Sequence, residues 1–200
     1  SEKFGMHHLL AKDNKKQEII FSEGETKALT KRHINKETCF KFDYRVSTHQ
    51  GKPCQVANYK INNRVVAQKL RFSDKTFKWV GSSTDVGLFG QHLWRDGGKM
   101  IVVTEGELDC MSVSQSQGNK WAVVSVKNGS QGAKRDIQKS LEWLEKFESV
   151  IFMFDMDRAG QSAALSCASV LTPGKAKIAH LPLKDANEML VQGRVKELID

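Results

Sequence analysis

Cysteine and long apolar runs are scarce in this sequence, and each scarcity excludes a class of protein. The 200 residues contain four scattered cysteines and no Cys-x-x-Cys pair. A zinc site or a disulfide framework needs closer spacing or a smaller secreted chain, so we expect free thiols and no zinc here. No run approaches the ~18 apolar residues of a membrane span, and the N-terminus lacks a secretory signal, which favours the cytoplasm. Since the chain begins at Ser1, we expect it to be part of a longer polypeptide.

Negative charge is scarce in the first half of the chain. Residues 1–98 carry 18 Lys or Arg against 10 Asp or Glu, whereas residues 99–200 carry 13 of each. The whole excess of +8 therefore lies in the first half. A basic module beside a separate acidic site suits an enzyme that acts on polyanions, although a solvated basic face would give the same charge.

The first half is predicted to be a small basic α+β unit over residues 25–95, after an arm or linker over 1–24. Residues 25–42 have apolar residues at helical spacing, and Asn35 suits the N-cap of a second short helix. From Tyr44 onward the period changes to two, which is typical of antiparallel strands. The predicted strands and hairpin turns are, in order, 54–59, 60–63, 64–71, 72–75 and 76–80.

The second half, residues 96–200, alternates apolar runs with amphipathic segments. This alternation predicts an α/β domain whose mostly parallel sheet is flanked by helices. The expected strands are 99–104, 122–126, 150–154 and 177–181. The expected helices are 108–117, 134–147, 158–171 and one or two within 186–199, with a glycine-bearing loop at 127–132.

Acidic residues follow two of the apolar runs directly. Glu105, Glu107 and Asp109 follow the run 99–104, and Asp155 and Asp157 follow the run 150–154. Open α/β sheets keep their ligand sites at the carboxyl ends of such strands. Acids gathered there repel one another unless a cation lies among them, and hard oxygen ligands suit Mg²⁺ or Mn²⁺.

The spacing of the acids suggests a role for each. Asp155 and Asp157 can face one side as metal ligands, and Glu105 is the candidate for proton transfer or a bridging ligand. Asp109, four residues after Glu105, can return to the same cleft. Of these four acids, the catalytic candidates are Glu105, Asp155 and Asp157. Glu107 alternates away from Glu105 and is expected to be structural or to support the metal ligands without binding the metal, and Asp185 would add a further metal contact.

These motifs resemble the TOPRIM signature of bacterial-type primases, topoisomerases and some nucleases. The similarity extends to the primase domain of the phage T7-type primase-helicases and covers the chain roughly from Ala28 onward. The segments that carry it are Gly87–Trp94, Val102–Glu107, Phe152–Asp157 and Lys184–Glu188.

The predicted hairpin over 64–80 interleaves cations with aromatic side chains. Basic residues contact phosphates and aromatic rings stack on bases, although aromatics in the core and solubilising lysines would look the same. The resemblance implies the first interpretation, with the basic stretch facing the active-site cleft and binding template or nucleotide. The residues concerned are Lys69, Arg71, Lys75 and Lys78.

The glycine-bearing loop is a weaker signal. Its amides could hold a triphosphate if a helix begins there. The resemblance implies that Asn128, Gly129 and Lys134 lie near the nucleotide, although the resembling primases have His at the position of Asn128. It also makes His92 a candidate nucleotide contact.

The resemblance implies a DNA-dependent RNA primase core that uses Mg²⁺ or Mn²⁺ to join ribonucleoside triphosphates on single-stranded DNA. Implied partners are a zinc-binding module and a hexameric helicase on the same polypeptide, and a replicative DNA polymerase, in the cytoplasm of a bacterial host. A TOPRIM nuclease and a catalytically weak DNA-binding platform stay open. A topoisomerase is disfavoured, because it needs a nucleophilic Tyr on a further domain and only Tyr44 and Tyr59 exist.

Overall fold

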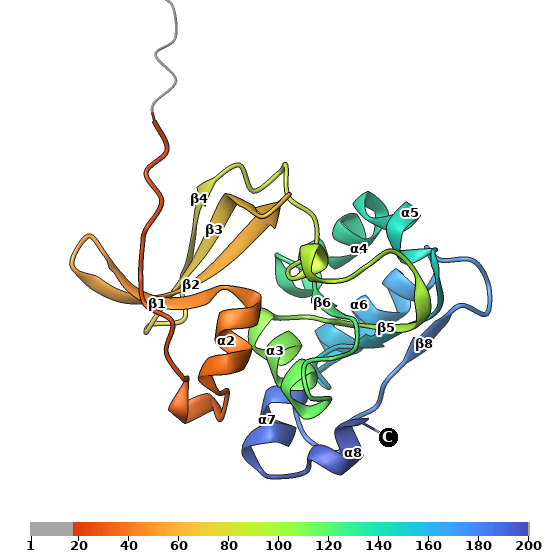
Figure 1. The fold of residues 1–200 in the computed structure, drawn as a ribbon. Helices are drawn as coiled ribbons and strands as arrows, with labels where there is room; N and C mark the ends of the chain where they lie inside the picture. Colours follow the sequence, from red (N-terminus) through yellow and green to blue (C-terminus); the bar gives the residue numbers. More distant parts are fainter. Residues whose placement is uncertain (1–17, 200) are drawn as a thin grey trace, which may run out of the picture.

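Residues 18–199 form two lobes, each built on its own four-stranded sheet, in the computed structural model (Figure 1). The sheet of the N-terminal lobe is antiparallel in the order β1-β2-β3-β4. Its elements are η1 (Thr30–Arg32), α2 (Lys36–Phe42), β1 (Tyr44–His49), β2 (Lys52–Ile61), β3 (Arg64–Phe72) and β4 (Phe77–Gly81).

The hairpins of this lobe follow from their turn residues. Asn62 and Asn63 join β2 to β3 with φ values of 51° and 64°, and Gln50 and Gly51 join β1 to β2 with φ values of 50° and 78°. Two consecutive left-handed residues are what a tight two-residue hairpin needs. Asn35 caps α2, since its side chain accepts a hydrogen bond from the Thr38 N–H.

The sheet of the C-terminal lobe is parallel, in the order β6-β5-β7-β8, as the alternation of strands and helices predicts. Helices cover both its faces (Figure 1). Its elements are η2 (Gln91–Leu93), β5 (Gly98–Thr104), α3 (Glu107–Ser116), β6 (Val123–Ser125), α4 (Gly129–Lys139), α5 (Leu141–Leu144), β7 (Phe147–Met153), α6 (Arg158–Ala168), β8 (Ala176–Ile178), α7 (Ala186–Val191) and α8 (Val195–Ile199).

One apolar core joins the two lobes. Phe89, in the connection between them, stacks on Phe42 of α2 with 5.6 Å between ring centroids and lies 5.4 Å from the Tyr59 ring of β2. Met111 and Val113 of α3 belong to the same buried cluster. Aromatic packing across the seam fixes how the lobes face each other, and therefore fixes the site between them.

Three local expectations are corrected by the structure. Residues 25–42 contain only the short turn η1 before α2, rather than a first helix. The loop expected at 127–132 is already helical from Gly129. The helix expected over 134–147 is divided at Ser140 between α4 and α5, and Phe147 begins β7.

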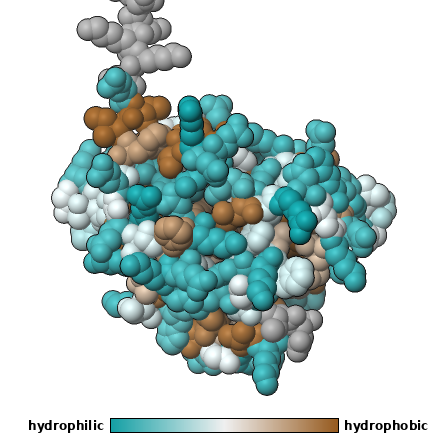
Figure 2. Space-filling view, viewed as in Figure 1, coloured by the Kyte–Doolittle hydropathy of each residue, from teal (hydrophilic) through white to brown (hydrophobic). Residues whose placement is uncertain are grey.

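Among residues 18–199, no helix is long and apolar enough to cross a membrane. The face shown in Figure 2 is mostly hydrophilic, with apolar side chains in small separate patches.

Candidate functional site

Three carboxylates meet at the carboxyl ends of the parallel strands. Asp109 comes from α3, Asp155 follows β7, and Asp185 precedes α7, and one oxygen of each lies within 4.8 Å of the others. Since β5 and β7 are neighbours and pair Thr104 with Met153, the residues that follow them leave the sheet at the same edge. The predicted convergence of acids from separate segments is therefore present.

Burial and mutual repulsion raise the pKa values of these acids. Burial, with the charge of Asp155, raises the pKa of Glu105 to about 7. Burial, with the charge of Asp185, raises the pKa of Asp155 to about 6. The pKa of Asp109 lies well above its usual range for the same two reasons, burial first and Asp185 second. Such a group of carboxylates holds excess negative charge that a cation would relieve.

Glu105 gives an independent sign that the site suits a cation. Its Oε1 is buried and has no hydrogen-bond partner among the described residues. The backbone of Gly160 lies close by, and a Cβ there would approach this oxygen to 2.8 Å and the Asp155 carbonyl oxygen to 2.3 Å. Buried polar atoms are almost always paired, so an oxygen that accepts no hydrogen bond among the described residues is suited to a cation or a proton. These residues fit a divalent cation bound by oxygen ligands.

Asp157 and Asp185 also serve as helix caps. Asp157 accepts a hydrogen bond from the Gly160 N–H at 2.7 Å and begins α6, and Asp185 accepts one from the Glu188 N–H at 2.9 Å and begins α7. A cap uses one oxygen of each carboxylate and leaves the other. Asp157 is exposed and lies outside the group of three, although its charge raises the pKa values of Glu105 and Asp155.

The acids form one wall of a cleft of about 510 Å³ between the lobes. The opposite wall is the face of the N-terminal sheet that carries Arg71, Lys75 and Phe77. Arg71 lies opposite Phe77 in the β3–β4 ladder, with its guanidinium 5.7 Å from the ring centroid. A cleft with acids on one wall and cations on the other can bind a metal ion and a polyanion side by side.

Lys69 lines this cleft, but its ammonium group is engaged inside the protein. It pairs with Glu107 at 3.0 Å and donates to the Lys127 carbonyl oxygen at 2.7 Å. Tyr59 donates to the same Glu107 at 2.7 Å. All three side chains are buried, so this network joins the N-terminal sheet to the start of α3. Glu107 is thus part of a contact between the lobes, in line with the structural role expected for it.

Three predicted contact residues lie away from the cleft. Lys78 pairs with Leu70 in the ladder, so it shares Leu70's face of the sheet, opposite to that of Arg71. His92 lies near Lys60 and Asp43, and burial, followed by the charge of Lys60, lowers its pKa. Lys134 is exposed on α4, the helix that packs against α6. The expectation that all the basic residues face the cleft is therefore wrong for Lys78.

The glycine-bearing segment does reach the cleft. Asn128 and Gly129 line it, and the Trp79 indole N–H donates to the Asn128 side chain at 3.3 Å. Gly129 has a φ of 62° where α4 begins, a left-handed conformation that favours glycine.

Two residues at the site were missed by reasoning from the sequence. The Asn187 N–H donates to Asp109 at 2.9 Å, and the Asn187 side chain donates to the Arg32 carbonyl oxygen at 3.0 Å. Asn187 belongs to a segment that the resemblance singles out, but nothing in the spacing links it to Arg32, which lies 155 residues earlier.

Each lobe matches a known protein family. Residues 24–81 match the family described as bacteriophage T7 DNA helicase/primase, N-terminal a+b fold. Residues 102–190 match the Toprim-like family and include the acids that meet in the cleft. A Toprim-like region with this acidic group is suited to a divalent metal ion.

Relatives at high identity extend over nearly the whole chain. The DNA helicase/primase of Enterobacteria phage T3 is 44% identical over 180 residues, which are 90% of this chain and 32% of that protein. The chain therefore spans about a third of that relative's length.

Two solved structures are similar as well. The primase fragment of the bacteriophage T7 primase-helicase protein is 46% identical with a TM-score of 0.84, over 89% of this chain and 74% of that one. The other contains the primase domains of two subunits with the T7 lagging-strand DNA polymerase, bound to an RNA/DNA hybrid and dTTP. It is 46% identical with a TM-score of 0.83, over 89% of this chain and 91% of that one.

Proposed function

This chain belongs to the family of the T7-type phage primase-helicases, and from that premise we propose that it is a primase core that makes short RNA primers on single-stranded DNA. The observation that carries the proposal is the cleft between the lobes, with Asp109, Asp155 and Asp185 on one wall and Arg71 and Lys75 on the other. The same arrangement could serve a nuclease, so the reaction itself has to be measured.

The acids would hold Mg²⁺ or Mn²⁺. Asp109, Asp155 and Asp185 are the proposed ligands, with Asp157 and Glu105 beside them. When bound, such ions stabilise negative charge on the attacking and leaving oxygens of a phosphoryl transfer.

The protein's own groups would position the reactants and move the proton. In primer synthesis the 3′-hydroxyl oxygen bonds to the α-phosphorus of the incoming nucleotide, and the bond to pyrophosphate breaks. Glu105 Oε1, which is buried and unpaired among the described residues, would accept the hydroxyl proton. A pKa of about 7 suits a group that gains and loses a proton near neutral pH.

The opposite wall would bind phosphates and bases. Arg32, Arg71 and Lys75 line the cleft and would contact the phosphates of template or nucleotide. Phe77 is 51% exposed on the same wall and offers a ring face for stacking on a base. Asn128 and Gly129 line the cleft and would contact the incoming nucleotide, whereas Lys134 and His92 are not among the residues that line it. Lys69 would act mainly by holding Glu107.

We infer the partners of this chain from its relatives. They are single-stranded DNA, ribonucleoside triphosphates, a replicative DNA polymerase, and a zinc-binding module and a hexameric helicase on the same polypeptide, in the cytoplasm of a bacterial host. Support comes from the T7 primase domains, which interact with the T7 polymerase and an RNA/DNA hybrid, and from the helicase/primase of phage T3.

A template-directed synthesis assay tests this proposal. The protein is given single-stranded templates, a complementary diribonucleotide, labelled ribonucleoside triphosphates and Mg²⁺ or Mn²⁺. Short labelled RNA is expected from the wild type and from Asp96→Asn, an exposed aspartate that pairs with Lys146 outside the cleft. Asp155→Ala and Asp157→Ala are expected to lose at least about a hundredfold.

Two other results would replace the proposal. Template cut without RNA synthesis, and lost in Asp155→Ala, would assign a nuclease. Template bound with neither reaction, under conditions that support the T7 primase fragment, would assign a binding platform.

A further inference from the structure

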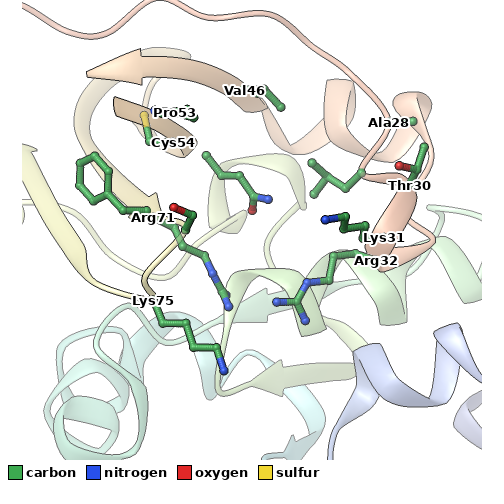
Figure 3. A pocket seen from close by; sticks show the side chains of 13 residues that line it. Ala28, Thr30, Lys31, Arg32, Val46, Pro53, Cys54, Arg71 and Lys75 are labelled. Carbon is green, nitrogen blue, oxygen red and sulfur yellow. The ribbon is translucent and has the colours of Figure 1, made fainter. Parts of the chain in front are cut away.

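A second cavity of about 440 Å³ lies beside the cleft, in the N-terminal lobe. It opens between η1 and the turn that joins β3 to β4. Figure 3 shows the charged ends of Arg32, Arg71 and Lys75 pointing into the same space, with Lys31 beside them. Nothing in the proposed reaction so far uses this cavity as a whole.

Its polar lining has one sign of charge. Four cationic side chains line the cavity, and none of the described residues that line it is Asp or Glu. Within residues 18–199, none of the four takes part in an ion pair. Among the described residues, the Arg32 guanidinium donates only a long 3.4 Å hydrogen bond to the Asn187 side chain, and the Arg71 guanidinium lies against the Phe77 ring. Cations gathered without a counter-charge form a site for an anion.

The cavity adjoins the cleft. Arg32, Arg71 and Lys75 line both spaces, whereas Lys31 lines only the cavity. Asn187 contacts both Asp109 in the cleft and Arg32 at the cavity rim. A ligand held at the acids could therefore extend its phosphates past these cations into the cavity.

Part of the remaining wall is apolar. Leu29, Val46 and Phe72 line it behind the charged ends. A cavity with an apolar wall, a few placed polar groups and a volume in the range of ligand pockets is suited to a defined small group rather than to a flat surface contact.

We propose that this cavity, here called the terminal-phosphate pocket, binds the 5′-triphosphate end of the first nucleotide of the new RNA strand. The proposal rests on the proposed primase function. A nucleic acid strand carries one charge per nucleotide, spread along its length, whereas a triphosphate gathers several charges at one end. Four unpaired cations around one cavity match the second distribution.

The chemistry of synthesis provides such an end. Each new bond joins the 3′-hydroxyl of the growing strand to the α-phosphorus of the next nucleotide, which releases pyrophosphate and a proton. The first nucleotide is never attacked at its own α-phosphorus. Its triphosphate is therefore kept at the 5′ end, one nucleotide away from the first reacting 3′-hydroxyl.

The test compares two diribonucleotides that differ only at the 5′ end, a triphosphate in one and a hydroxyl in the other. Both are extended on the same template, and kcat/KM is measured for each. The wild type is expected to prefer the triphosphate about tenfold. Lys31→Ala is expected to bring this ratio close to one, and Lys31→Arg is expected to keep it. Lys27→Ala is the matched control, because Lys27 is an exposed lysine outside the pocket that pairs with Glu25.

Binding of the two diribonucleotides in EDTA gives a readout that needs no synthesis. If the chain makes no RNA but Lys31→Ala weakens binding of the triphosphate form alone, the pocket stands and the proposed function fails. If Lys31→Ala lowers extension of both forms by the same factor, the cavity contacts the template strand and this inference is overturned. A wild type that treats both ends alike would overturn it too.

Discussion

At the scale of single residues, the raised pKa values of Glu105 and Asp155 imply that ionisation of these two groups lowers the free energy of unfolding of the metal-free protein. A carboxyl group whose pKa is raised in the folded state favours folding while it is protonated. That contribution is complete below about pH 4, the usual range of these groups, and is lost as the pH rises through their folded values of about 6 and 7.

In EDTA, the free energy of unfolding is therefore expected to fall by about 1–3 kcal/mol between about pH 4 and pH 8, after allowance for the partial exposure of both groups. Urea titrations at both pH values measure this change. The double variant Glu105→Gln, Asp155→Asn should show a clearly smaller fall. An equal fall in the variant would mean that other groups carry the pH dependence.

Glu107 belongs to the same motif as Glu105 and Asp109 but has a structural role rather than a place in the group of acids. Its carboxylate is buried between Lys69 and Tyr59. Removing one partner of a buried ion pair leaves the other charge without compensation. We expect Lys69→Met to lower the free energy of unfolding by about 3 kcal/mol. The double variant Lys69→Met, Glu107→Gln should lose less than the sum of its single variants.

Urea unfolding of the four proteins of this cycle measures the coupling. Asp96→Asn is the comparison, because its ion pair with Lys146 is exposed and should contribute about 1 kcal/mol or less. Additive effects of Lys69→Met and Glu107→Gln would show that the pair does not hold the lobes together.

At the scale of elements, the junction between β7 and α6 is the most tightly fitted part of the site. Gly160 lies in the first turn of α6, where a Cβ would come within 2.3 Å of the Asp155 carbonyl oxygen and 2.8 Å of Glu105 Oε1. The first neighbour is backbone and cannot move aside. Gly160→Ala is expected to cost about 2 kcal/mol or more and to displace both carboxylates, although alanine favours helices elsewhere.

Thermal or urea unfolding, together with the primer assay, measures both effects. Ser162→Ala is the matched variant, since Ser162 is exposed on the same helix and should change stability by only about 0.5 kcal/mol. A Gly160→Ala protein as stable and active as Ser162→Ala would mean that the junction can relax.

How much of the fold can be predicted from the sequence differs from one helix or strand to the next. The parallel strands and the acids that follow them in the sequence were predictable. Buried strands are continuous apolar runs, and acidic residues directly after such runs are easy to recognise. The bounds of β1 were not predictable, although the period of two begins at Tyr44, since Tyr44–His49 is mostly half-buried and mixes polar with apolar residues. The start of α4 was hidden by Gly129, a residue that usually marks a loop.

Site residues, too, were predictable where a local sequence pattern places them and not where tertiary packing does. The acids that converge in the cleft are each tied to a strand end or a helix start. The direction of Lys78 depends on the register of β3 and β4, which places it opposite Leu70, and period-two spacing alone does not set that register. Asn187 and Arg32 meet through tertiary packing over 155 positions, for which one sequence carries no signal.

At the scale of the whole molecule, most of the cations that line the cleft lie on the N-terminal lobe and face the acids of the C-terminal lobe, and Lys184 lies beside those acids. The N-terminal half carries the entire net charge of +8. Three cations of this lobe line the cleft and take part in no ion pair among residues 18–199, and these are Arg32, Arg71 and Lys75, whereas Lys69 is paired with Glu107. These three are placed to contact a nucleic acid strand that also reaches the acids. We therefore expect the orientation of the cationic side chains to matter more for binding than their number.

Binding of a fluorescent single-stranded DNA to the metal-free protein, from about 50 to about 200 mM salt, tests this. Three phosphate contacts predict a slope of about −2 in log affinity against log salt, since each single-strand contact adds roughly −0.7. Arg71→Ala should weaken binding several-fold and reduce the slope by about 0.7, whereas Lys78→Ala removes the same charge from the opposite face and should change neither by much. Equal losses in the two variants would mean that net charge alone drives binding, and that the strand does not follow the wall that faces the acids.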